Sequence, residues 1–175
     1  KIQKIIITFF CVLFFVTVAG CGKAHLNTIK ETTDISAYSE IHVLNTEISS
    51  HEQEDKLQSL NQEFAQFSKD EIVSALTQKS KFGLVKELNS SPGLLVIEST
   101  VHIVYGSRAL RYWVGFGAGK GSVVINLKLK DSLSGEIKSE LESKSDLSVG
   151  AFGGSMDKVI KNSIKKVIKQ FVEKL

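Results

Sequence analysis

Two segments of the chain, residues 122–130 and 136–144, alternate apolar and polar side chains almost without interruption. In a β-strand successive side chains point to opposite faces, so this alternation predicts strands with one buried face and one face in water. The residues between them, 131–135, are of types that accept turn geometry. The pair therefore predicts a β-hairpin, with Ile137 and Leu141 of its second strand facing inward.

The rest of the chain supplies two helices and two further strands. Residues 40–48 alternate as a first strand, and residues 94–105 form a strong strand after a turn at 89–93. Residues 55–81 repeat apolar side chains at helical spacing, and a last helix is expected after Ser155, a suitable N-cap. The order β-α-β-β-β-α predicts an α+β fold, with a mostly antiparallel sheet of about four strands and two helices packed on one face.

The last helix carries one apolar stripe, whose members are Met156, Ile160, Ile164, Val167, Ile168, Phe171 and Leu175. Such a stripe suits either the apolar face of the sheet or a membrane surface. Packing on the sheet is favoured, because the apolar face of the sheet needs a cover.

The N-terminus has the pattern of an export signal. Lys1 and Lys4 precede an apolar run from Ile5 to Ala19, which is about the length of a signal-peptide core and shorter than a bilayer span. The run ends in Val-Ala-Gly before Cys21, which resembles the bacterial lipobox. The expected product is a lipoprotein whose Cys21 thiol carries fatty acyl chains such as palmitate, and stable anchoring needs more than one chain.

This interpretation divides the chain into a signal peptide (1–20), a lipidated cysteine with a flexible tether (21–39) and one α+β domain (40–175). Gly22, rather than Asp, follows the cysteine, so in a host with two membranes we expect the periplasmic face of the outer membrane. In a host with one membrane we expect the cell membrane. Without Lys1 and Lys4 the chain has 20 basic and 19 acidic residues, a balance that does not favour nucleic acid as a partner.

The segment 107–122 has an unusual composition. It contains the only arginines of the chain, Arg108 and Arg111, its only tryptophan, and glycines at every second position from Gly115 to Gly121. Arginine beside aromatic residues is typical of protein-interface hot spots. The candidate binding surface comprises Arg108, Arg111, Tyr112, Trp113, Gly115, Gly117, Gly119 and Lys120. The alternative is structural: the glycines permit close packing or a flexible loop, the arginines pair with carboxylates and the aromatic rings fill the core.

The glycines do not form a nucleotide-binding motif. A P-loop needs a Ser or Thr after Gly-Lys, and here Gly121 follows Lys120. The dinucleotide pattern fails at Lys120, and a strand is expected where a helix N-terminus is required. No nucleotide is therefore expected as a ligand.

The block R-x-x-R-Y-W-V-G-F-G-A-G-K, followed by D-S-L-S-G and G-A-F-G-G, resembles an uncharacterised family of bacterial lipoproteins, catalogued as a domain of unknown function. The resemblance extends from about residue 41 to residue 175, and its most specific parts are 108–121 and 150–154. It implies an envelope lipoprotein of α+β type, and it implies no catalytic residue.

The sequence contains no pattern for catalysis or for a metal. Its histidines are His25, His42, His51 and His102. Paired strands would bring His42 and His102 together on the solvent face, but two histidines without a third ligand make a poor zinc site. We therefore expect a non-enzyme without a metal or cofactor other than its lipid.

Three functional hypotheses follow from the sequence. The first is an interaction or assembly module with an envelope protein as partner. The second is a binding protein for an anionic envelope ligand, a glycan or a lipid headgroup, held by Arg108, Arg111, Tyr112 and Trp113. The third is a hydrolase that uses His42 or His102.

Overall fold

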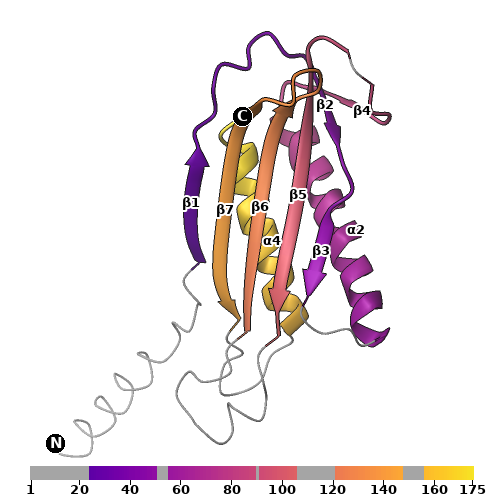
Figure 1. Cartoon of the computed structure of the whole chain (residues 1–175), viewed down its shortest axis with the longest axis vertical. Coiled ribbons are helices and arrows are strands. Elements are labelled where there is room, and N and C mark those ends of the chain that lie inside the picture. The colour runs from indigo at the N-terminus through magenta and orange to yellow at the C-terminus, as the bar shows by residue number, and fades with distance from the viewer. Residues whose placement is uncertain (1–23, 51–54, 90, 106–120, 148–155) are drawn as a thin grey trace, which may run out of the picture.

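The computed structural model describes residues 24–50, 55–89, 91–105, 121–147 and 156–175. Seven strands form one sheet, and two helices cover one of its faces (Figure 1). The elements are β1 (Ala24–Lys30), β2 (Glu40–Val43), β3 (Glu47–Ser50), α2 (Asp55–Lys79), β4 (Gly83–Val85), β5 (Leu94–Val104), β6 (Gly121–Asp131), β7 (Ile137–Leu147) and α4 (Met156–Val172).

The strand order in the sheet is β1-β7-β6-β5-β2-β4, and β3 also pairs with β5. The three long strands and β1 are antiparallel, whereas β2, β3 and β4 join by parallel pairing. The predicted α+β class, the mostly antiparallel sheet and the two helices are confirmed. The count of about four strands and the order β-α-β-β-β-α are matched only roughly. The predicted strand at 40–48 is two short strands, β2 and β3, and β1 and β4 were not predicted.

The single strand predicted at 40–48 is two strands, separated by an irregularity. Val43 pairs with Ile97, and Glu47 pairs with Thr100. Four residue steps from Val43 to Glu47 therefore lie opposite only three steps of β5, so the 40–50 segment contains one extra residue. An extra residue of this kind reverses which side chains face inward. Thr46 is consequently buried, and its hydroxyl lies 2.6 Å from that of Ser99.

The hairpin of β6 and β7 is confirmed, with one change of register. Leu127 pairs with Leu141 as the alternation predicts, but the register shifts after Leu129, so Ile137 pairs with Lys130. Residues directly opposite each other share a face, and Lys130 lies on the polar face. The prediction that Ile137 faces inward is therefore wrong, and its side chain is half-buried on the outer side.

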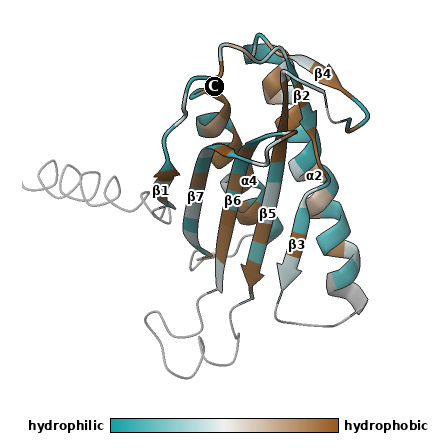
Figure 2. Ribbon diagram, turned by 45° about the horizontal axis from the view of Figure 1, so that its top comes forward, coloured by the Kyte–Doolittle hydropathy of each residue, from teal (hydrophilic) through white to brown (hydrophobic). Residues whose placement is uncertain are grey.

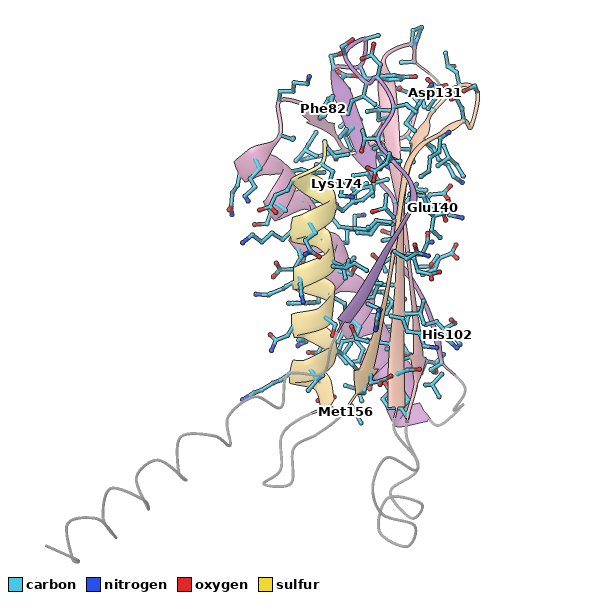
Figure 3. All side chains as sticks on the ribbon, turned by 90° about the vertical axis from the view of Figure 1, so that its left-hand side faces the viewer. Phe82, His102, Asp131, Glu140, Met156 and Lys174 are labelled. Atoms are coloured by element: carbon cyan, nitrogen blue, oxygen red, sulfur yellow. The ribbon has the colours of Figure 1, made fainter. Side chains whose placement is uncertain are left out.

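The core lies between the sheet and the two helices (Figures 2 and 3). From α4 it includes Ile160, Ile164, Val167, Ile168 and Phe171, and from α2 it includes Phe64, Ile72 and Leu76. The apolar stripe of the last helix thus packs on the sheet, and the membrane-surface alternative for that stripe is excluded. In the part of the chain that the structure describes, no helix is long and apolar enough to cross a membrane.

The tether predicted over 21–39 is wrong from residue 24 onward. β1 pairs with β7 in antiparallel fashion, from Ala24 opposite Ser145 to Lys30 opposite Glu140. The chain that follows is also fixed, since Ile35 is 6% exposed within the core. Without β1, the long strand β7 would present an open row of backbone groups, and pairing satisfies that row.

Candidate functional site

The residues predicted from sequence to bind a partner, Arg108, Arg111, Tyr112, Trp113, Gly115, Gly117, Gly119 and Lys120, lie outside the described residues, as do Cys21 and residues 150–154. Their described neighbours show where that segment joins the sheet. β5 ends at Val104 and β6 begins at Gly121, which is buried and pairs with Leu147 at the end of β7. The end of β5, the start of β6 and the end of β7 therefore lie at one end of the sheet, which we call the Gly121 end (Figure 1).

The opposite end of the same strands, which we call the Asp131 end, is held by a polar cluster. The Tyr38 hydroxyl donates to Asp131 Oδ2 at 2.8 Å. Asp131 Oδ1 accepts from the backbone N–H groups of Ser134, at 2.6 Å, and Leu133, at 3.0 Å. These contacts close the β6–β7 turn, where Gly135 takes a positive φ of 70°.

The cluster changes the acidity of both partners. The backbone hydrogen bond from Ser134, followed by the Tyr38 hydroxyl, lowers the pKa of Asp131 to about 2. The hydrogen bond to Asp131 in turn raises the pKa of Tyr38 above its ordinary value. The ionised carboxylate thus accepts the hydrogen bonds from Tyr38, Leu133 and Ser134, which makes the cluster structural in character.

The outer face of the sheet, away from the helices, carries charges of both signs in pairs. Lys130 and Glu98 are 2.5 Å apart across β5 and β6, and Lys128 lies 3.6 Å from Glu140. Asn126 also donates to Glu140 at 2.9 Å. Cross-strand pairs of this kind stabilise the sheet modestly and leave this face with little net charge.

In the described sheet β1, β4 and β3 each pair on one side only, so each presents an open edge. Apolar side chains are exposed at the edges formed by β1 and β4. On β1 these are Leu26, 38% exposed, and Ile29, 51% exposed; Leu84 on β4 is 38% exposed and Leu88 beyond it is 55% exposed. Open edges with apolar side chains are the sites where sheets add strands from other chains.

A pocket of about 400 Å³ lies between α2 and the strands β2 and β4. Its lining residues are His42, Val43, Lys69, Val73, Leu84, Val85 and Lys86. The Nδ1 of His42 donates to the Val85 carbonyl at 3.1 Å, and the Lys69 ammonium donates to the Asn45 side chain at 2.7 Å. The pocket therefore combines an apolar wall with cationic groups, and sequence reasoning missed it because Leu84 and Val85 belong to an unpredicted strand.

The structure does not bring His42 and His102 together. His42 pairs with Val96 on β5, whereas His102 lies six residues farther along that strand, a separation of roughly 20 Å. His102 Nδ1 instead lies 2.7 Å from the Ser49 hydroxyl. Among the described residues no group of His, Cys, Asp and Glu is placed to hold a metal ion.

The fold defines a small α+β domain, an open sheet with two helices on one face. The chain belongs to the family described as "Domain of unknown function (DUF4410)", whose model matches residues 22–154. The expected membership in a domain family of unknown function is thereby confirmed. A comparison with curated proteins finds no match.

A comparison with solved structures finds similar chains. The chain is similar to a PelC dodecamer from Paraburkholderia phytofirmans, with 11% identity and a TM-score of 0.52 over 84% of this chain and 96% of that chain. Protein XCC0632 from Xanthomonas campestris has 12% identity and a TM-score of 0.49, over 83% and 89% of the two chains. Lipoprotein GNA1162 from Neisseria meningitidis has 13% identity and a TM-score of 0.34, over 77% and 99%. At 11% identity the likeness to the PelC structure concerns the fold alone.

Proposed function

We propose that the protein is a bacterial envelope lipoprotein, anchored through Cys21 at the periplasmic face of the outer membrane. Its domain is a non-catalytic assembly module that associates with other protein chains. The lipobox-like sequence before Cys21 supports the anchor. The open sheet edges support the assembly role, and the similar PelC structure is a dodecamer.

The observation that carries the proposal is the pair of unlike open edges, β1 and β4, at opposite sides of one sheet. Natural sheets usually protect their edges with charge, bulges or a covering segment. The β1 edge has an irregularity of register between Thr28 and Lys30, but Ile29 there is still exposed, as is Leu84 on the β4 edge. If the β1 edge of one copy meets the β4 edge of the next, the contact is heterologous and repeats around a ring when the rotation closes.

The oligomeric state of the lipidated protein, measured by native mass spectrometry from membranes, tests this proposal. Ile29→Lys and Leu84→Lys place a charge on one edge each and are expected to convert assemblies to monomers. Leu133→Lys is the matched control, because Leu133 is 55% exposed in the β6–β7 turn, away from both edges. A monomeric wild-type protein, or edge variants that assemble as well as the control, would contradict edge-to-edge assembly.

The segment that contains Arg108 and Arg111 is proposed as a contact for a different envelope protein. Its arginines and aromatic residues have the composition of an interface hot spot. Crosslinking in intact envelopes, followed by purification, is expected to capture a protein with the wild type and to lose it with Arg108→Ala/Arg111→Ala. Capture of the same protein by a folded double variant would refute a role for the arginines.

A second candidate function is the binding of an anionic amphipathic ligand, such as a lipid with a charged headgroup. The pocket between α2 and β4 favours this, because Val73 and Leu84 offer apolar contact while Lys69 and Lys86 offer positive charge. Short-chain phosphatidylglycerol is expected to bind more tightly than short-chain phosphatidylcholine, as measured by native mass spectrometry. Val73→Trp should fill the pocket and abolish that binding; equal binding of the two lipids would refute this role.

A further inference from the structure

The start of β1 limits how far the domain can lie from a lipid attached to Cys21. β1 begins at Ala24, so only Gly22 and Lys23 separate the lipidated residue from the first strand. An extended chain spans at most about 3.5 Å per residue, so the three steps from Cys21 to Ala24 cover about 10 Å. The predicted long tether would have allowed several times this distance.

The same strand shows which part of the domain is held there. Ala24 pairs with Ser145, two residues before the end of β7 at Leu147, and Leu147 pairs with Gly121. The lipid attachment point therefore adjoins the Gly121 end of the sheet. In Figure 3 the labelled Met156, at the start of α4, lies toward this end, whereas Asp131 lies toward the other.

The long strands run from one end of the domain to the other (Figure 1). Ten residue steps separate Gly121 from Asp131 along β6, which corresponds to about 33 Å. The broad faces of the domain carry paired charges of both signs, such as Lys130 with Glu98 on the sheet and Lys161 with Glu63 between the helices. Charged pairs of this kind keep their water, which disfavours an arrangement in which the domain lies flat on a bilayer.

We propose that the Gly121 end of the domain faces the bilayer, within about 10 Å of the lipid headgroups, and that the Asp131 end points away from it. This inference rests on the proposed anchor at Cys21. The open edges β1 and β4 then run along the membrane normal, so chains that associate through them spread in the plane of the membrane. The Tyr38–Asp131 cluster is carried to the end of the domain that lies farthest from the membrane.

Two labels on one hairpin test the orientation. The mature chain contains no cysteine besides Cys21, so single-cysteine variants can be labelled selectively. Asp146→Cys places a fluorophore at an exposed position near the Gly121 end, and Leu133→Cys places one in the turn at the Asp131 end. The two sites are separated by about 30 Å along the strands.

The lipidated variants are reconstituted in vesicles that contain nitroxide-labelled headgroups, and quenching of each fluorophore is measured. Quenching at residue 146 is expected to exceed quenching at residue 133 several-fold. Equal quenching at the two sites, which a domain lying flat would produce, overturns the proposal, and so does stronger quenching at residue 133.

Insertion of about 15 Gly and Ser residues between Lys23 and Ala24 is the matched control for the linker. A flexible insert of this length has a mean span of roughly 20 Å, so the difference between the two labels should largely disappear. If the difference persists, the short connection is not what orients the domain, and the inference is overturned.

Flotation of the vesicles separates failure of the anchor from failure of the orientation. The wild type should float with the vesicles and Cys21→Ser should not. If the wild type and Cys21→Ser float equally, the anchor at Cys21 is refuted, and the proposed orientation is refuted with it. Flotation through Cys21 combined with equal quenching refutes the orientation alone and leaves the anchor standing.

Discussion

Replacement of Ile35 by Ala tests whether residues 31–39 belong to the folded domain or to a tether. Ile35 is 6% exposed and belongs to the hydrophobic core, although it precedes the first strand that the alternation predicts. If the segment were a tether, the substitution would leave the free energy of unfolding unchanged. In the structure, the substitution removes three buried carbon atoms and leaves a cavity against the sheet.

The expected cost is about 2–4 kcal/mol, the range for buried Ile→Ala substitutions with allowance for the small exposure of this side chain. For a domain of this size, that corresponds to a fall of roughly 5–15 °C in the melting temperature. Ile29→Ala is the matched control in the same predicted tether, because Ile29 is 51% exposed and its truncation should cost less than about 1 kcal/mol.

The free energy of unfolding of both variants is measured in a soluble form that starts at residue 22, by urea unfolding monitored with circular dichroism. The slope of free energy against urea should be unchanged, because the surface exposed on unfolding is nearly the same. If Ile35→Ala and Ile29→Ala have equal effects below about 0.5 kcal/mol, residues 31–39 do not pack as described and the reasoning is refuted.

Three further predictions concern the polar contacts. Tyr38→Phe removes the hydrogen bond to Asp131 and should raise the pKa of that carboxyl, as measured by NMR titration; an unchanged pKa would show that the hydroxyl does not contribute. Because the pKa of Asp131 is about 2 in the folded protein and 3.8 ordinarily, its contribution to stability is present above about pH 4 and is lost as the pH falls toward 2. Unfolding of Asp131→Asn should therefore vary less with pH over that window than unfolding of the wild type, and equal slopes would contradict this. Thr46→Val and Ser99→Ala each leave a buried hydroxyl without its partner and should each cost about 1–3 kcal/mol, while the double variant should cost clearly less than their sum; additive effects by urea unfolding would exclude the 2.6 Å contact.

Periodicity was sufficient to predict the long elements. β5, β6 and β7 each have eleven residues, and an alternation of that length identifies both the strand and its buried face. The stripe of α4 likewise predicted the residues that pack on the sheet. The short strands lacked this signal, because three or four residues, as in β4, are compatible with either turn or strand.

For the predicted binding segment, too, the sequence identified the residues but not their surroundings. Composition alone singled out Arg108, Arg111 and Trp113, but composition carries no information about which other segments lie nearby. Only the strand register places the flanking Gly121 next to Leu147, and thereby at the end of the sheet where β1 begins.

The sequence by itself determined the fold class, the hairpin, both helices and the membership in a domain family, because these depend on local periodicity and on motifs read along the chain. Only the tertiary structure decided that residues 24–30 pair with β7 and that Ile137 turns to the outer face. The partners of residues 24–30 on β7 are more than a hundred residues away in the chain. The orientation of Ile137 depends on a single shift in the register between β6 and β7. The side chains of β1 are largely exposed, so the strand is held mainly by backbone hydrogen bonds to β7. Backbone pairing of this kind requires no particular pattern of side chains, and the sequence therefore does not reveal it.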